Sequence, residues 1–467
     1  MKQRALPLAL AGLFSLSSSL GFGESLSQIY ELALKNDATL KAAEATYRAN
    51  LETEKLSRSA LLPQIGATST YRDTEFEGES FGITNFQPPQ YGKVPSERDT
   101  DTLTHSVTLS QPLFDLSAWF SFRAGKATSK QARAQFAADQ QDLIIRTAEA
   151  YFNALRANEN LEAARAEERA AKRQLEQTQQ RFDVGLIAIT DVHEARAVFD
   201  NTVAQRLSFE AQLGTAFEAL SVLTNQGHSS LNRLSEEFPV TQPVPADRAE
   251  WVEFAIANNH LLTAARYATQ SSYQNARSKK AEHLPTLSGS YSYSTDDTEG
   301  TSKTSNPLAS DIVDEHANTE TIQVQLSVPL FSGGGVSASR RQAYNQYLAA
   351  EQNRIGTQRR VVQQTRSLHL TVGTDVQRIK ARKQNIVSAQ SALDATKAGY
   401  EVGTRNIVDV LQSQRSLYAA IRDYANARFD YVLNMLKLKQ QAGNLSPQDI
   451  YNLDKWLIAD KAKKQDL

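Results

Sequence analysis

Residues 400–411 read Tyr-Glu-Val-Gly-Thr-Arg-Asn-Ile-Val-Asp-Val-Leu, and residues 182–192 echo them as Phe-Asp-Val-Gly-Leu-Ile-Ala-Ile-Thr-Asp-Val. In both stretches an aromatic residue closes a long helical pattern, Val-Gly forms a turn, and Asp-Val opens another helical pattern. A glycine at such a turn supplies the left-handed conformation that ends a helix, and Thr and Asp suit the next helix start. The sequence therefore predicts two helical hairpins with matching tips, at residues 183–190 and 401–407.

Other motifs recur at nearly the same spacing as these tips. A Leu-Pro pair returns after 222 residues, a Pro-Leu-Phe triplet after 217, and the tip Val-Gly after 218. We therefore expect two similar halves, with repeat 1 over residues 24–248 and repeat 2 over residues 249–467. Residues 225–248 contain Pro and Ser and are interpreted as the connector between the halves.

The N-terminus has the pattern of a secretory signal peptide. Lys2 and Arg4 are followed by an apolar stretch over residues 5–16 and by Gly21-Phe22-Gly23 before Glu24. This order of charge, apolar stretch and small residues predicts a signal peptide over residues 1–23 and favours it over a buried helix. The protein is therefore expected to be exported.

Composition excludes several functional classes. The 51 Lys and Arg nearly balance the 52 Asp and Glu, so no basic field points to nucleic acid. The absence of cysteine excludes disulfides, thiolate metal sites, a cysteine nucleophile and a lipid anchor on an N-terminal cysteine. The seven histidines are scattered, and no phosphate-binding loop or catalytic triad stands out, so we expect no enzyme, no cofactor, no metal and no catalytic residues.

Long helices dominate both halves. Residues 118–182 contain no proline, and a helix of roughly 65 residues would be about 100 Å long. In repeat 2, Val372, Ile379, Ile386, Leu393 and Tyr400 fall seven residues apart, as in a coiled coil. Shorter helices are expected over residues 25–60 and 251–282. No apolar run after the signal peptide is long enough for a transmembrane helix.

Each half also contains two stretches of alternating apolar and polar residues, in expected β-hairpins at 63–113 and 285–330. The clearest is residues 322–328, where Ile, Val, Leu and Val alternate with Gln, Gln and Ser. Strands of about ten residues with one apolar face suit a bilayer, although an ordinary soluble hairpin has the same pattern. Residues 75–101 and 294–318 are rich in polar residues and are expected to be surface loops.

Four membrane strands cannot close a barrel, and open strand edges are not tolerated in lipid. Barrels need at least about eight strands, so a dimer or trimer with eight or twelve strands is expected. The polar strand face and the helices would then enclose an aqueous duct.

The Leu-Pro and Pro-Leu-Phe motifs, the order of elements and above all residues 399–411 resemble the TolC family of outer-membrane channel proteins over nearly the whole mature chain. The resemblance implies a mainly α protein with a transmembrane β portion: a homotrimer with a 12-stranded β-barrel of four strands per chain, a long periplasmic α-helical barrel and an equatorial mixed α/β belt. The connector and the C-terminal tail would lie in that belt. It also implies localisation in the outer membrane, extending into the periplasm, as the exit duct of tripartite efflux pumps or type I secretion systems. The implied partners are a periplasmic adaptor protein and an inner-membrane transporter of the RND, ABC or MFS type.

The same resemblance assigns a gate to the tips. Its latch would consist of Thr190, Asp191, Tyr400 and Arg405, with Arg405 and the Tyr400 hydroxyl both bound to the Asp191 carboxylate. Helix capping or a solvated face is the plainer interpretation of Asp191 and Arg405. Such exposed links contribute roughly 0–1 kcal/mol each, which suits a latch that opens.

Two further groups of residues follow from the resemblance. Asp409 matches an aspartate of the lumen constriction, and Gln412 stands where better-known members carry a second aspartate, so a single anionic ring with weaker cation block is expected. The adaptor is expected at the tip segments Val184, Gly185, Leu186, Val402, Gly403 and Thr404.

Two other functions fit parts of the pattern. An exported structural coiled-coil protein, such as a periplasmic adaptor or a surface stalk, would share the helices. It would have one helical hairpin flanked by barrel-type domains, and not two hairpins with four amphipathic strands. A duct dedicated to one secreted protein, instead of a general efflux outlet, fits the sequence equally well.

Overall fold

The computed structural model describes residues 23–303 and 312–459. The predicted signal peptide therefore lies outside the described residues except for Gly23. The chain folds as two compact units, each assembled from both repeats. The strand unit comprises Thr46–Gln135 and Leu261–Thr357, and the helical unit comprises Met1–Ala45, Phe136–His260 and Gln358–Leu467.

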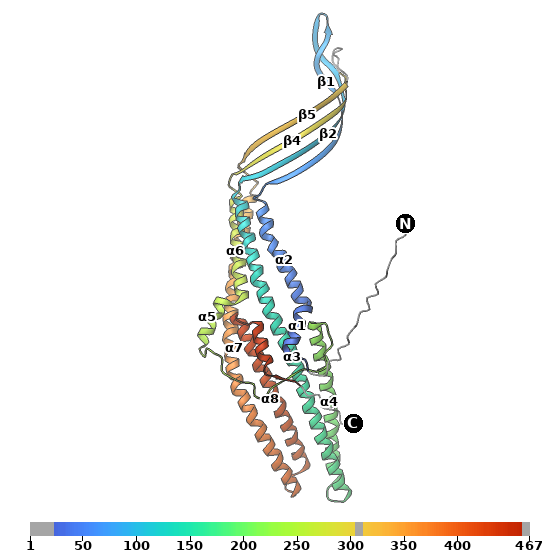
Figure 1. The fold of residues 1–467 in the computed structure, drawn as a ribbon, viewed down its shortest axis with the longest axis vertical. Helices are drawn as coiled ribbons and strands as arrows, with labels where there is room; N and C mark the ends of the chain where they lie inside the picture. The colour runs from blue at the N-terminus through green and yellow to red at the C-terminus, as the bar shows by residue number, and fades with distance from the viewer. Residues whose placement is uncertain (1–22, 304–311, 460–467) are drawn as a thin grey trace, which may run out of the picture. The chain divides into compact units, whose positions relative to one another are not determined.

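The strand unit contains a four-stranded antiparallel sheet in the order β1-β2-β4-β5 (Figure 1). Its strands are β1 Gln64–Phe86, β2 Pro89–Phe114, β4 Thr286–Lys303 and β5 Ile312–Ser327. The central pair joins the two repeats, with Val107 opposite Tyr293. Strands β1 and β5 form the two edges, and every residue of β5 but Val313 is exposed.

The strands are longer than the sequence predicts. β1 and β2 have 23 and 26 residues, and their pairing continues to Phe86 opposite Pro89. The expectation of a surface loop over residues 75–101 is therefore wrong. The charged residues that indicated a loop lie on exposed strand faces, where Lys93 pairs with Glu79 at 2.9 Å. The expected loop at 294–318 is also strand over 294–303 and 312–318, while residues 304–311 lie outside the described part.

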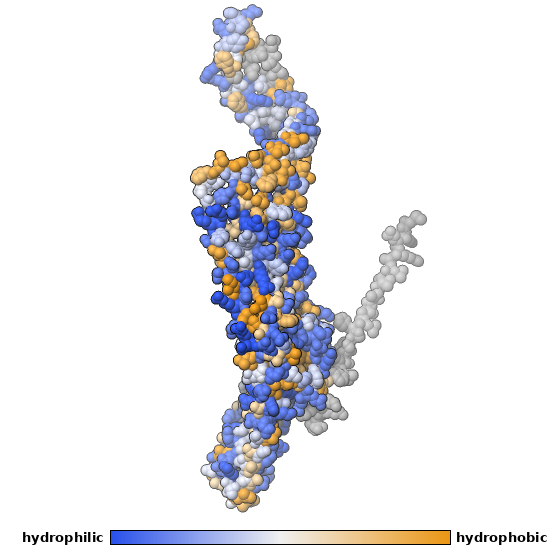
Figure 2. All heavy atoms as spheres, turned by 90° about the vertical axis from the view of Figure 1, so that its left-hand side faces the viewer, coloured by the Kyte–Doolittle hydropathy of each residue, from blue (hydrophilic) through white to orange (hydrophobic). Residues whose placement is uncertain are grey.

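Four helices of the strand unit meet the sheet: α2 Ala38–Ser59, α6 His260–Ala281, and the sheet-proximal parts of α3 Leu116–Asp183 and α7 Gly335–Glu401. α3 and α7 have 68 and 67 residues, which confirms the predicted helix length. Hydrophobic atoms gather where the strands meet these helices (Figure 2). Leu113, Phe114, Leu330 and Phe331 are 51–93% exposed there.

The helical unit contains the rest of α3 and α7 together with α1 Leu26–Asn36, α4 Ile189–Thr224, α5 Arg248–Asn258, α8 Ile407–Ala442 and α9 Pro447–Asp454. Its main core lies where α1, α3 and α8 meet the connector, and Ile29, Tyr151 and Phe152 are fully buried there. A smaller core near the tips consists of Leu393, Ile407, Val410, Leu411 and Leu417. None of the helices in the described ranges is long and apolar enough to cross a bilayer.

The connector and the C-terminal tail meet in this unit. β3 Arg233–Leu234 pairs antiparallel with β6 Leu457–Ile458. The Tyr431 hydroxyl of α8 donates to the Thr241 carbonyl and accepts from the Thr241 N–H, at 2.8 and 3.0 Å. The mixed α/β region expected of these two segments is therefore present.

Two helix breaks separate α1 from α2 and α5 from α6, where the sequence predicts unbroken helices over 25–60 and 251–282. Asp37 and Asn259 adopt extended conformations at these breaks, 222 residues apart. The Asp37 carboxylate accepts the Leu40 N–H at 2.6 Å, and the Asn259 amide donates to the Gln441 carbonyl at 3.0 Å. Short polar side chains that bind the backbone compete with helical hydrogen bonds, so the repeat carries a built-in break.

Candidate functional site: the helical tips

Both hairpins turn on a glycine in the left-handed region. Gly185 has φ 77° and Gly403 has φ 76°. In the first turn the Gly185 and Leu186 N–H groups donate to the Phe182 and Arg181 carbonyls, at 2.8 and 2.9 Å. The second turn repeats this arrangement, which satisfies the last carbonyls of a helix. The glycine-terminated tips predicted from the sequence are confirmed.

The returning helices begin differently from one another. α8 is capped by Asn406, whose side chain accepts the Asp409 N–H at 2.9 Å, whereas α4 follows Ala188 with no side-chain cap. Asp191 and Asp409 lie 218 residues apart and both occupy the third position of their helices. Their charge suits the positive end of the helix dipole. Asn406, and not Thr or Asp, is therefore the capping residue of the second tip.

The four predicted latch residues are not brought together within one chain. Arg405 faces Asp409 in the first turn of α8, with Nη1 3.7 Å from Oδ2, and Arg405 is 62% exposed. The Asp191 carboxylate has the neighbouring Thr190 hydroxyl at 3.4 Å. The Tyr400 hydroxyl is buried and lacks a hydrogen-bond partner among the described residues. The single chain thus leaves the predicted acceptor and one predicted donor of the latch available.

An aromatic–cation contact that the sequence did not reveal positions Tyr400. The Arg181 guanidinium of α3 lies 4.8 Å from the centre of the Tyr400 ring of α7. Both residues line a groove of 780 Å³ that also includes Arg173, Lys397 and Glu401. Three cations face one acid in this groove, so its field is positive.

Ion pairs above the tips connect the first hairpin to the second. Arg422 of α8 binds Glu167 of α3 at 3.0 Å, with side chains only 16% and 6% exposed. Arg156 of α3 binds Asp430 of α8 at 2.6 Å. The partners lie more than 250 residues apart, at |i−j| of 255 and 274, so no local pattern could have predicted them.

A buried carboxylate lies beside these pairs. Asp375 of α7 is 2% exposed and accepts a hydrogen bond from Asn434 at 2.8 Å. Burial raises the pKa of the Asp375 carboxyl, and Arg378 at 2.9 Å opposes that rise. The α7–α8 hairpin is thus held by polar contacts that are largely screened from water.

The remaining predicted site residues lie on the surface of the chain. Asp409 is 39% exposed, and Gln412 is exposed one turn further along α8. At the tips Val184, Leu186 and Val402 are 69–76% exposed, and Gly185, Gly403 and Thr404 are exposed beside them. Exposed apolar residues at a rigid turn provide a surface that a protein partner can cover.

Two copies of a helical hairpin joined to a β-hairpin, sharing one open antiparallel sheet, define the class of two-repeat outer-membrane channel proteins. The chain belongs to the outer membrane efflux protein family, whose profile matches residues 29–226 and 251–444. The two matched segments correspond to the two repeats and leave out most of the connector and the tail. The chain is accordingly an outer-membrane transport protein.

Relatives match over nearly the full length. Outer membrane protein TolC of Vibrio cholerae is 38% identical, over 97% of this chain and 98% of the relative. Outer membrane protein TolC of Escherichia coli is 34% identical, over 97% and 89%. The alkaline protease secretion protein AprF of Pseudomonas aeruginosa is 29% identical, over 92% and 86%.

Solved structures share the fold at low identity. The outer membrane protein VceC of Vibrio cholerae has a TM-score of 0.72 at 18% identity, covering 90% of this chain and 96% of VceC. The CmeC outer membrane channel of Campylobacter jejuni has a TM-score of 0.70 at 17% identity, covering 98% of each chain.

Proposed function

We propose that three copies of this chain form an outer-membrane exit duct for efflux and type I secretion, closed at its helical tips. The observation that carries the proposal is the open four-stranded sheet, with β1 and β5 as free edges. In lipid an unpaired edge costs several kcal/mol per unsatisfied backbone group, so edges must be closed by further strands. Three chains joined β1 to β5 provide twelve strands, within the range of known barrels.

The relatives support both branches of this transport. Three of them are TolC proteins, and two others, AprF and the proteases secretion protein PrtF, are named for protease secretion. A general efflux outlet and a dedicated secretion duct share the same fold. Because the TolC relatives have the higher identities, 34–38% against 28–29%, the general outlet is the favoured assignment.

The proposed latch acts between hairpins once the chains assemble. Asp191 is half-buried at an uncapped helix start, and the Tyr400 hydroxyl is buried without a partner. A buried hydroxyl left unpaired costs about 1–3 kcal/mol, so a closed state that gives Tyr400 an acceptor is favoured. Arg405, held only by a 3.7 Å contact to Asp409, can exchange that partner for Asp191 of an adjacent chain.

The proposed partners are a periplasmic adaptor, which would contact the exposed Val-Gly tips, and an inner-membrane transporter that it recruits. The exposed apolar side chains of Val184, Leu186 and Val402 support the first contact. An exported coiled-coil protein is disfavoured, because it has no use for an exposed four-stranded sheet.

The experiment for this assignment is native mass spectrometry of the detergent-extracted protein. The account predicts a trimer that retains detergent or lipid and withstands dilution. A protein that stays monomeric and soluble without detergent would contradict both the closed sheet and the duct.

A further inference from the structure

Glu24, the first residue after the predicted signal peptide, is bound to the connector by its backbone. Its N–H donates to the Ser230 carbonyl, and its own carbonyl accepts from the Asn232 N–H, both at 3.0 Å. The Tyr151 hydroxyl of α3 lies 3.1 Å from the Glu24 carbonyl oxygen and 2.9 Å from that of Asn232. Burial raises the pKa of this hydroxyl, so Tyr151 stays a donor at every physiological pH.

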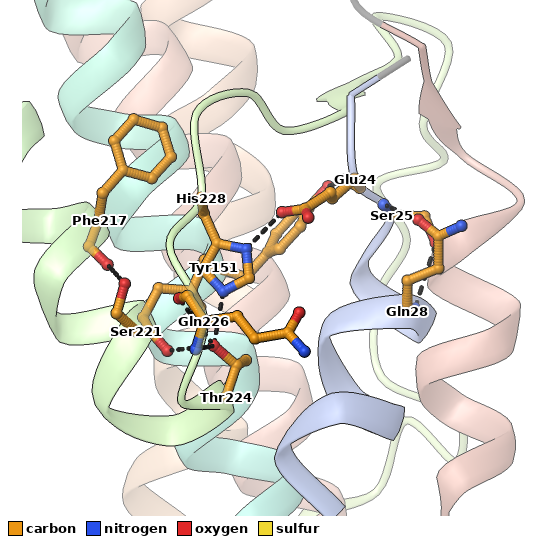
Figure 3. A network of polar contacts seen from close by, with 10 residues as sticks. Glu24, Ser25, Gln28, Tyr151, Phe217, Ser221, Thr224, Gln226 and His228 are labelled. Carbon is orange, nitrogen blue, oxygen red and sulfur yellow. Dashed lines mark hydrogen bonds and ion pairs between the residues drawn. The ribbon is translucent and has the colours of Figure 1, made fainter. Parts of the chain in front are cut away.

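The Glu24 side chain is fixed as well (Figure 3). Its carboxylate is bound by Nδ1 of His228, whose side chain is completely buried. The other ring nitrogen of His228 lies 2.6 Å from the Thr224 hydroxyl at the end of α4. A single terminal residue thus joins α1, α3, α4 and the connector.

One polar atom at this junction has no partner. Asn232 Oδ1 is buried, and no described residue donates a hydrogen bond to it. It lies against the backbone just before Glu24, because a Cβ added to Gly23 would be 2.8 Å from it. A buried acceptor left unpaired costs about 1–3 kcal/mol, so this position calls for a donor.

Removal of residues 1–23 supplies a donor at this place. Hydrolysis of the Gly23–Glu24 peptide bond releases Gly23 as a carboxylate and turns the Glu24 amide into an ammonium group. The amide has a single N–H, which is already bound to Ser230, whereas the ammonium group has three. Departure of Gly23 also vacates the space beside Asn232 Oδ1.

We propose that the junction is a binding site for the chain's own α-ammonium group, held between the Ser230 carbonyl and Asn232 Oδ1. The proposal rests on the predicted cleavage site and is independent of the channel assignment. The junction is then complete only in the processed chain, so cleavage after export stabilises the packing of α1 against the connector.

The groups that surround the ammonium position set its titration. They are the Glu24 carboxylate, His228 of the connector, Tyr151 of α3, Asp454 of α9, which binds the Ser27 hydroxyl at 2.7 Å, and Arg233 of β3. A bound ammonium has a pKa above the ordinary value of about 7.7–8.0. Its contribution to stability is then full below that value and is lost as pH rises through the raised pKa.

The test uses the purified mature protein. Intact mass first locates the N-terminus, and competitive acylation between pH 6 and pH 10, read by peptide mass spectrometry, gives the pKa of the α-amino group. The proposal predicts an N-terminus at Glu24, an α-amino pKa above the ordinary range and acylation at least tenfold slower than in the urea-unfolded protein. Asn232→Ala should lower that pKa, and Asn232→Asp should raise it.

Asn452→Ala, an exposed position on α9, is the matched control and should leave the pKa unchanged. A mature chain that begins elsewhere would overturn the proposal, as would an α-amino group with an ordinary pKa and an unretarded reaction. A pKa that neither Asn232 variant shifts would overturn the role of the side chain. If Asn232→Ala does not fold, the parent protein and Asn232→Asp decide. A missing channel activity with a raised α-amino pKa would refute the function alone.

Discussion

Asp37 shows how one residue both shapes the chain and ties its parts together. Its carboxylate ends the helical path between α1 and α2 and binds the Arg146 guanidinium through two contacts of 2.9 and 3.0 Å. The side chain is 4% exposed, so the pair is largely screened from water. The hydrogen bond from Arg146 holds the pKa of the Asp37 carboxyl below its usual range.

We predict that Asp37→Asn destabilises the protein by about 1–3 kcal/mol and Asp37→Ala by about 3–5 kcal/mol. Asn keeps the helix break, as Asn259 does in repeat 2, but loses the charge that faces Arg146. Because the folded pKa is depressed, this stability is present above the ordinary pKa of about 3.9 and disappears as pH falls through the folded value. Thermal midpoints between pH 3 and pH 7 should therefore show the gap to Asp37→Asn closing at low pH; a constant gap would contradict the ion pair.

Asp409 carries the second prediction at this scale. In the proposed trimer, Asp409→Asn removes a ring of three charges and should reduce cation selectivity, seen as a smaller reversal potential across a salt gradient. Gln412→Asn is the matched control, because it changes a side chain one turn away without changing charge. A reversal potential equal to that of the parent protein would exclude Asp409 from the constriction.

Single residues were predictable from sequence where local geometry decides. Gly185 and Gly403 follow from the turn that each must make, and both have the left-handed conformation. The link of Arg405 to Asp191 depends on other hairpins or other chains, so within one chain Arg405 meets Asp409 instead. Arg181 stacking on Tyr400 joins helices more than 200 residues apart and has no signature in the sequence.

At the scale of elements, the tips are the parts whose form depends most on one residue each. A side chain at Gly185 or Gly403 has open space around it but must adopt φ near 77° or 76°. We predict that Gly185→Ala and Gly403→Ala each cost about 1–2 kcal/mol locally. Hydrogen exchange of residues 178–192 and 396–410 should accelerate about tenfold.

Gly214→Ala provides the control for these variants, since it lies inside α4 with open space around it. Alanine is favoured over glycine in a helix interior by about 1 kcal/mol, so exchange should slow around residue 214. Unchanged exchange at both tips would show that the turns do not need their glycines.

Helix lengths were predictable because a heptad pattern without proline extends over many turns, as in α3 and α7. Strand lengths were not. In residues 75–101 polar and charged residues replace the alternating apolar ones, yet Glu79 and Lys93 pair across the strands and the ladder continues to Phe86 and Pro89. Where both faces of a hairpin are exposed, no apolar pattern is required, and the signal for a strand is lost.

For the whole molecule, the internal repeat is the feature that sequence reveals best. The same offset relates the Leu-Pro motifs, the tips and the unforeseen breaks at Asp37 and Asn259. The repeats do not form separate bodies: strands of both share one sheet, and helices of both share one core. What no single chain contains is the closure of the sheet edges and of the latch, because both require neighbouring copies.

The central claim is a pore that is closed by a latch at its tips. It is tested most directly by the conductance of the purified, detergent-extracted protein in planar bilayers, with the parent beside the Tyr400→Phe/Arg405→Ser double variant. Gln412→Asn serves again as a control with an intact latch. The account predicts a small, cation-selective conductance for parent and control, and a severalfold larger one for the double variant. Equal conductance of all three would contradict the latch, and no conductance from any of them would contradict the pore.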